Sequence, residues 1–192
     1  MNKQEYIQKQ IKEIKEIWFK DHIAVYESFG EGESKIERLK WSKPGDSNFY
    51  IHYVTSGGCL MVYGDLGEQT YNFYRQISIL GFTEEKQWPY YCSKAHDIDG
   101  YCDLDEWVPK HAKEWIEEYA EGNGEKLPED WTDYLDEIPE YKLVEYICDE
   151  TADSEFAYGC YKAGKSINMR ALSHFIGLVM ANEQLKNSLT TT

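Results

Sequence analysis

The chain has 192 residues, of which 42% are hydrophobic and 15% aromatic, and it carries a formal net charge of −15. This composition is sufficient for a packed core and excludes a wholly disordered chain. No apolar run approaches the about 20 residues that span a bilayer, and the N-terminus lacks the apolar centre of a signal peptide. The five cysteines are widely spaced and form no Cys-x-x-Cys pair, which favours reduced thiols. We therefore expect a cytoplasmic protein.

The first 20 residues have the spacing of an amphipathic helix. Apolar residues recur at steps of three and four, with polar residues between them: Ile7, Ile11, Ile14 and Trp18. This spacing places the apolar side chains on one face of a helix, so we predict a helix over residues 1–20.

Residues 22–75 change to short runs that are rich in β-branched and aromatic residues. The runs are IAVYESF, KIERLKWS, FYIHYVTS, CLMVYGD and EQTYNFY, and turn-forming compositions separate them. These connections are too short for crossover helices, so neighbouring strands must run antiparallel. We predict an antiparallel β-meander of about five strands.

Within this region, the segment VYGDLGEQTYNFY (62–74) contains two glycines that flank an Asp-Leu pair. A phosphate-binding loop would need a Lys that reaches the phosphate and a helix that follows the loop. The segment has no such lysine, and a strand pattern follows it. We interpret GDLG as a hairpin turn in which Gly64 or Gly67 adopts a positive φ.

Helical patterns dominate after residue 75. Residues 74–82 predict a short helix or turn, and Pro89 interrupts an irregular aromatic link. A helix is expected from a cap at Asp103 to a stop at Gly122 and Gly124. Three segments follow: a short helix at 128–138, a helix or strand at 139–150, and a long helix at 166–187 that Ser166 precedes. Together with the meander they predict an α+β fold, with helices on one side of the sheet, in a single domain of residues 1–192.

One mainly helical segment carries the charge imbalance of the chain. Residues 97–155 contain 21 acidic residues and four lysines, a net charge of −17, whereas the rest contains 14 acidic and 16 basic residues. Such a field repels nucleic acid and attracts cationic surfaces. The sequence therefore disfavours direct nucleic-acid binding and favours a partner protein with a basic groove.

The stretch from YIHYVTSGGCL through VYGDLGEQTYNFY to YYCSKAHDIDGYCDLDEW resembles a family of small proteins encoded by bacteriophages and prophages. In that pattern a strand-turn-strand with Gly-Asp-(Leu/Met)-Gly leads to an acidic helix start, which here reads Leu104-Asp105-Glu106. The likeness covers about residues 35–120 and carries over no catalytic residue. It implies an origin in a phage or mobile element, where small acidic proteins often inhibit host defence, CRISPR systems included.

Two groups of metal ligands occur near the start of the acidic segment. Alternate carboxylates beside a glycine are typical of a calcium loop, because Ca²⁺ prefers six to eight oxygen ligands; these are Asp97, Asp99 and Asp103. A second, mixed set has ligand types that zinc uses but matches no zinc motif; it contains Cys92, His96, Cys102 and His111. The simpler interpretations are an acidic loop that caps the next helix, and core cysteines with surface histidines. We predict no cofactor.

No residue pair supports nucleophilic or acid–base catalysis. His174 and Ser173 are neighbours on a helix and point in different directions, so His174 is expected to be a core or interface histidine. His52 lies within a strand and His22 follows the first helix, and neither has a partner in the sequence. The 16 Tyr and six Trp residues favour a core and a protein-binding face.

The sequence thus predicts a non-catalytic inhibitor that binds a nucleic-acid-binding defence protein of the host, such as a CRISPR effector, through an acidic surface that mimics phosphates. The expected contacts are Asp103, Asp105, Glu106, Glu114, Glu117, Glu118, Glu121, Asp130, Asp133, Asp136 and Glu137. The simpler interpretation is a solvated acidic face that keeps the protein soluble.

Two alternatives belong to other classes. A divalent-metal-binding protein or metal-dependent enzyme would use the loop from Asp97 to Asp105. A homodimeric scaffold would pair the apolar faces of the first and last helices, which contain Ile7, Ile11 and Ile14, and Phe175, Ile176 and Val179.

Overall fold

The structure is a computed structural model that describes residues 3–95, 105–123, 142, 146–147 and 154–190. It confirms the predicted α+β class. The chain packs into two compact units, where the sequence predicted one domain. We call residues 8–104 with 168–192 the sheet unit, and residues 1–7 with 105–167 the helical unit.

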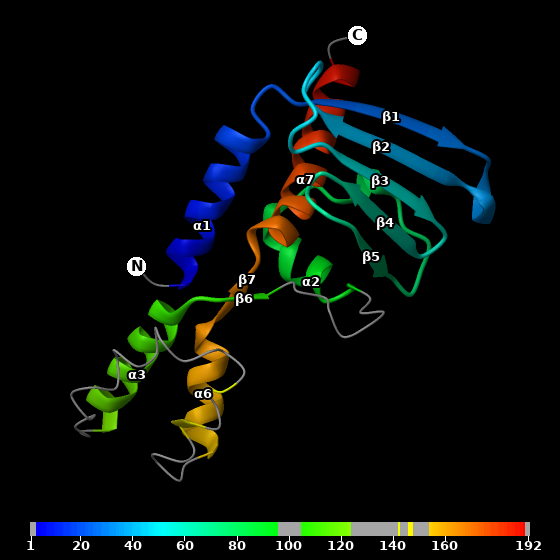
Figure 1. The fold of residues 1–192 in the computed structure, drawn as a ribbon. Helices are drawn as coiled ribbons and strands as arrows, with labels where there is room; N and C mark the ends of the chain where they lie inside the picture. The colour runs from blue at the N-terminus through cyan, green and yellow to red at the C-terminus, as the bar shows by residue number, and fades with distance from the viewer. Residues whose placement is uncertain (1–2, 96–104, 124–141, 143–145, 148–153, 191–192) are drawn as a thin grey trace. The chain divides into compact units, whose positions relative to one another are not determined.

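The sheet unit contains the predicted antiparallel meander, in the order β1-β2-β3-β4-β5 (Figure 1). Each strand pairs with the next one in the sequence, as the short connections require. The strands are β1 (Ile23–Phe29), β2 (Ile36–Ser42), β3 (Ile51–Ser56), β4 (Cys59–Gly64) and β5 (Gln69–Asn72), with a 3-10 turn η2 (Gly32–Ser34) between β1 and β2.

The long helix α7 (Met169–Thr190) covers one face of this sheet (Figure 1). The strand residues that point toward it are buried, and their alternation with exposed residues matches the period of two expected for a half-buried sheet. The Tyr53 hydroxyl donates a hydrogen bond to the carbonyl oxygen of His174 on α7, at 2.8 Å. A Cβ atom at Gly177 would lie 2.7 Å from the Tyr53 hydroxyl oxygen, so glycine permits this close approach. Helices on one side of the sheet are thus confirmed.

The predicted N-terminal helix is present as α1 (Lys3–Glu13), followed by a π-helical turn η1 (Ile14–Trp18). Ile7, Ile11 and Ile14 of its apolar stripe are buried within the chain and Trp18 is half-buried, and the apolar face of α7 is buried as well. The proposed dimer contacts are therefore wrong, since each of these side chains exposes 4% or less: Ile7, Ile11, Ile14, Phe175, Ile176 and Val179.

The GDLG segment connects β4 to β5 as a turn, as predicted. Both glycines have positive φ, with values of 153° for Gly64 and 95° for Gly67. A side chain at Gly64 would also meet the backbone carbonyl of Tyr50. Leu66 between them is buried and anchors the turn in the core.

The aromatic link was predicted to be irregular at Pro89, and this prediction is wrong. Residues Trp88–Cys92 form a short helix, α2, with Pro89 in its first turn. Proline is tolerated there because the first N–H groups of a helix have no intrahelical partner. Two 3-10 turns precede α2, η3 (Ile79–Gly81) and η4 (Glu85–Gln87), and η3 lies within the predicted short helix or turn.

The helical unit corrects two predicted helix starts. Asp105–Trp107 is a strand, β6, that pairs antiparallel with β7 (Lys165–Ile167), so Ser166 lies in a strand, while the expected cap Asp103 lies outside the described residues. Helix α3 (Pro109–Asn123) begins at a proline, which disfavours helical backbone at the preceding residue. Helix α7 is capped instead by Asn168, whose side-chain oxygen accepts from the Arg170 N–H at 2.8 Å.

The core of the helical unit lies between α3 and α6 (Ser154–Gly164), a helix that the sequence analysis missed. The Trp115 ring packs where a side chain of Gly159 would be, which lets the two helices approach closely. The buried members of this core are Ala112, Ile116, Ile147, Phe156, Ala157 and Cys160. The segments predicted at 128–138 and 139–150 lie outside the described residues, apart from Lys142, Tyr146 and Ile147.

None of the helices in the described part of the chain is both long enough and apolar enough to cross a membrane.

Candidate functional site

Four of the predicted acidic residues in the described part of the chain form a stripe on α3. Glu114, Glu117, Glu118 and Glu121 follow one another at steps of three, one and three residues, which places them on one side of the helix. The opposite side carries the buried Ala112, Ile116 and Ala120. Glu117, Glu118 and Glu121 are exposed, whereas Glu114 is half-buried. We call these four residues the acidic stripe.

Two of the predicted acidic contacts have partners within the helical unit. The Lys110 ammonium lies 3.8 Å from a carboxylate oxygen of Glu114, one helical turn away. The carboxylate of Glu106 on β6 accepts a hydrogen bond from the Tyr6 hydroxyl at 2.9 Å. These two carboxylates are therefore held by the chain itself, and the exposed members of the acidic stripe remain the better candidates for partner binding.

The other predicted contacts cannot be placed in the same way. Asp105 belongs to β6. The remaining five lie outside the described residues: Asp103, Asp130, Asp133, Asp136 and Glu137.

The two predicted metal-ligand sets are only partly described. Asp97, Asp99, Asp103, His96 and Cys102 lie outside the described residues. Of the mixed set, Cys92 is half-buried on α2 and His111 is buried on α3, with the edge of its ring against Tyr6 at a centroid distance of 5.0 Å. The expectation of a surface histidine is thus wrong for His111. Within the described ranges, no group of three or more His, Cys, Asp or Glu side chains could hold a metal ion.

His174 is a core histidine, as expected. It exposes 4% of its surface on the sheet-facing side of α7, and its Nε2–H donates to the Leu66 carbonyl at 3.1 Å. Its Nδ1 lies 3.4 Å from the Tyr71 hydroxyl. Burial lowers the pKa of His174 to about 4 and outweighs the opposing effect of the Leu66 hydrogen bond. The Ser173 hydroxyl donates to the Arg170 carbonyl, so the two neighbours form no catalytic pair.

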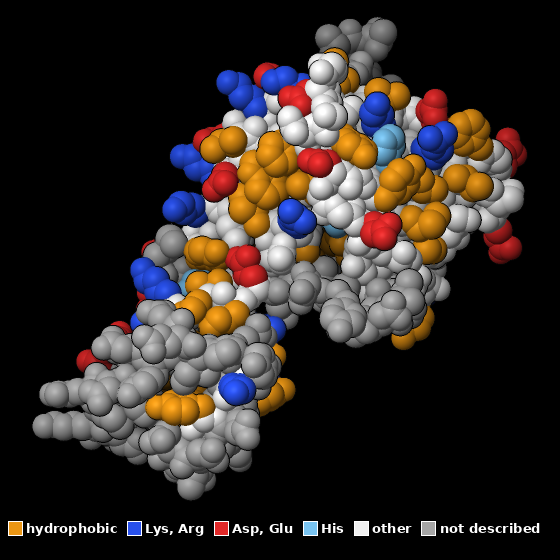
Figure 2. All heavy atoms as spheres, in the orientation of Figure 1, with side chains coloured by type: hydrophobic (Ala, Val, Ile, Leu, Met, Phe, Trp, Pro, Cys, Tyr) orange, Lys and Arg blue, Asp and Glu red, His pale blue; other side chains and the backbone are white. Residues whose placement is uncertain are grey.

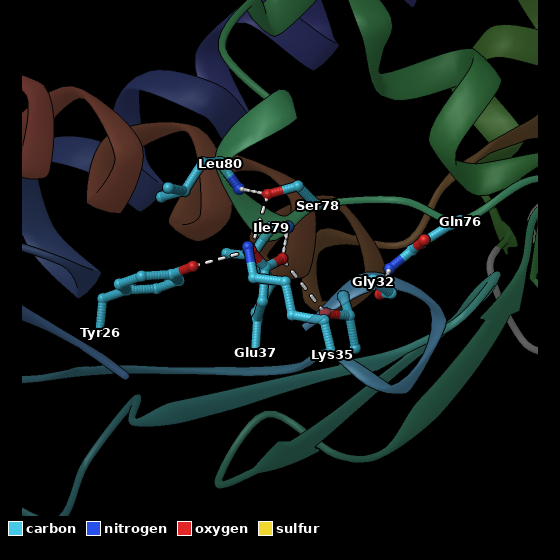
Figure 3. A network of polar contacts seen from close by, with 9 residues as sticks. Tyr26, Gly32, Lys35, Glu37, Gln76, Ser78, Ile79 and Leu80 are labelled. Carbon is cyan, nitrogen blue, oxygen red and sulfur yellow. Dashed lines mark hydrogen bonds and ion pairs between the residues drawn. The ribbon is translucent and has the colours of Figure 1, made fainter. Parts of the chain in front are cut away.

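The sequence analysis missed a buried carboxylate, Glu37 on β2, which is 1% exposed. Figure 3 shows this carboxylate at the centre of a polar network. One oxygen accepts from the Tyr26 hydroxyl at 2.7 Å, the Lys35 ammonium at 2.8 Å and the Ser78 hydroxyl at 2.9 Å. The other accepts from the Ile79 N–H at 2.7 Å and the Thr55 hydroxyl at 3.3 Å. We call these six residues the Glu37 network.

The electrostatics of the Glu37 network exclude a role in proton transfer near neutral pH. Burial acts to raise the pKa of Glu37, but hydrogen bonds from Lys35, Tyr26, Ile79 and Ser78 outweigh it and lower the pKa to about 2. A carboxylate with this pKa and five donors stays ionised and has little capacity left to accept a proton. The network instead joins strands β1, β2 and β3 to the turn η3.

A signal for Glu37 is present in the sequence. In the run KIERLKWS, Glu37 has the same phase as Leu39 and Trp41, which both point into the core. A charged residue in the inward phase of a strand needs buried partners. Those partners come from residues 26 to 79, so their arrangement cannot be derived from the local pattern.

Comparison of the chain with known protein families, with curated proteins and with solved structures finds no match. The fold and the described side chains together define an α+β protein with an acidic surface on one helix and, separately, a buried carboxylate network.

Proposed function

We propose that this chain is a non-catalytic inhibitor that binds a cationic groove of a nucleic-acid-binding protein. The phage-like resemblance favours a defence protein of the bacterial host as the target, such as a CRISPR effector, with both proteins in the host cytoplasm. The observation that carries the proposal is the confinement of the net charge of −17 to residues 97–155.

The acidic stripe supports this proposal within the described part of the segment. Its exposed carboxylates project from one side of a helix whose other side is packed in a core, so the backbone positions that carry them are fixed relative to one another. Side chains three or four positions apart on a helix lie about 5–6 Å from each other at Cβ. A basic groove that normally contacts a row of phosphates would meet a comparable row of negative charges here.

The simpler interpretation, a solvated acidic face, predicts no saturable binding. The test measures binding of the full chain to a CRISPR effector–guide RNA complex, and its competition with duplex DNA, from 50 to 500 mM salt. We expect competition, with an affinity that falls as salt rises because ion pairs with exposed carboxylates are screened. An affinity that is flat over the salt series would contradict the proposal.

The carboxylates of the acidic stripe can be tested directly. Replacing Glu117, Glu118 and Glu121 together by Gln is expected to weaken binding about tenfold or more at low salt, since each exposed ion pair contributes about 0.5–1 kcal/mol. The matched control replaces three exposed acidic residues of the sheet unit by Gln, and it should bind like the wild type: Glu16, Glu31 and Glu33. Equal losses in both variants would indicate a net-charge effect without a defined site.

A further inference from the structure

The face of the sheet opposite α7 is unusually apolar for a surface. Antiparallel sheets with one solvated face normally place polar side chains on that side. Here six large hydrophobic side chains on it are between 40% and 52% exposed: Ile23, Val25, Phe29, Ile36, Met61 and Tyr63. We call this side of β1–β4 the open face. Exposed apolar surface of this kind marks interaction sites.

The strand register gathers these side chains around a cationic centre. One row across the sheet contains Val25, Lys40, His52 and Tyr63. The next row contains Glu27, Arg38, Val54 and Met61. Where Figure 1 draws β1–β4, Figure 2 shows hydrophobic side chains mixed with Lys or Arg, with Asp or Glu and with a histidine.

The charges of the open face leave Lys40 available. Arg38 lies 3.7 Å from the Glu27 carboxylate, whereas Lys40 forms no ion pair within the described ranges. The rings of His52 and Tyr63 are stacked at 5.0 Å and form a flat apolar wall beside it. Burial lowers the pKa of His52, and the charges of Lys40 and Arg38 lower it further, so this ring is neutral at physiological pH.

We propose that the open face is a second binding surface, which takes a segment of a partner protein that combines apolar side chains with a carboxylate. The apolar side chains contact Val25, Val54 and Met61, and the carboxylate pairs with Lys40. Charge complementarity favours this occupant, because the charged side chains on the open face of β1–β4 are Arg38 and Lys40 against Glu27 alone, and Glu27 already pairs with Arg38. A nucleic acid fits less well, since a phosphate backbone needs several cations and the whole chain carries a charge of −15.

The proposal is tested with a displayed library of random dodecapeptides, selected against the full-length protein. We expect enriched peptides that combine Asp or Glu with aliphatic or aromatic residues. Lys40→Glu and Met61→Asp should each weaken their binding tenfold or more. The matched controls, Lys9→Glu and Ile17→Asp, alter exposed residues of the sheet unit on α1 and η1 and should leave binding unchanged.

A repeat selection against the Lys40→Glu variant separates direct contact from misfolding. We expect the enriched peptides to change from acidic to basic residues, because the charge they meet is reversed. Failure to enrich any peptide, or enriched peptides that bind all variants equally, would overturn the proposal. Two other outcomes would also overturn the proposal. If the protein binds an oligothymidylate of 15 nucleotides more tightly than the enriched peptides, the occupant is a nucleic acid. If light scattering shows self-association that Met61→Asp abolishes, the occupant is a second copy of the chain.

Discussion

Glu37→Gln is expected to destabilise the sheet unit by about 3 kcal/mol at pH 7. A folded-state pKa of about 2, against an ordinary value of 4.5, corresponds to this amount of stabilisation of the ionised form. Glutamine has nearly the same shape, but its amide group places N–H donors against the donors of the Glu37 network. Buried donors without an acceptor are costly, so repacking cannot recover the loss.

The measurement is urea denaturation followed by circular dichroism, with hydrogen exchange of strand amides to assign the loss to the sheet unit. Glu27→Gln on the neighbouring strand is the control, because this carboxylate is exposed and its ion pair with Arg38 contributes less than about 1 kcal/mol. The difference between wild type and Glu37→Gln should shrink as the pH falls from 4.5 toward 2, since the folded-state pKa is the lower one. A loss below 1 kcal/mol at pH 7 would show that the network stabilises little.

The sequence predicted the sheet unit well because its signals are local. Short runs with turn compositions between them determine an antiparallel meander with few alternatives. The spacing of Ile7, Ile11 and Ile14 likewise predicted a helix correctly. Helical spacing does not show which surface the apolar side chains pack against. The same residues were therefore assigned to a dimer, although they are buried within the chain.

The errors concern contacts between residues far apart in the sequence. Strands β6 and β7 are each three residues long and exist because they pair across about 60 residues, so neither has a recognisable local pattern. Each was read as the start of the helix that follows it. The helix that carries the acidic stripe was predicted, but its start was placed at Asp103, whereas the helix begins at Pro109. The open face was missed because its rows form only when four strands are in register.

The second large effect is expected at His174 and appears as a dependence on pH. Its pKa of about 4 in the folded protein lies below the ordinary value of 6.5, so the folded state favours the neutral imidazole. The associated stabilisation is complete above pH 6.5 and is lost as the pH falls from 6.5 to 4. It amounts to about 3 kcal/mol, which corresponds to roughly 10 °C in Tm for a chain of this size.

His174→Gln should remove this part of the acid sensitivity while keeping an N–H that can donate to the Leu66 carbonyl. We expect the variant to be less stable than the wild type at pH 7.5, because a flexible amide packs less well beside Tyr71 than the imidazole does. Between pH 6.5 and 4 the two stability curves should converge. His52→Gln is the control, since its ring lies on the open face and its change should alter the curve less.

Convergence of these curves would show that the turn between β4 and β5 is held to α7 by an uncharged imidazole. Protonation of His174 keeps the Nε2–H bond to Leu66 but turns the Nδ1 acceptor into a donor that faces the Tyr71 hydroxyl. The charge would then lie among buried aromatic rings, with no carboxylate hydrogen-bonded to the imidazole within the described residues. Parallel curves over this range would mean that the folded protein accommodates the imidazolium, and that acid sensitivity between pH 6.5 and 4 comes from other histidines whose pKa is lowered by burial, such as His22 and His111.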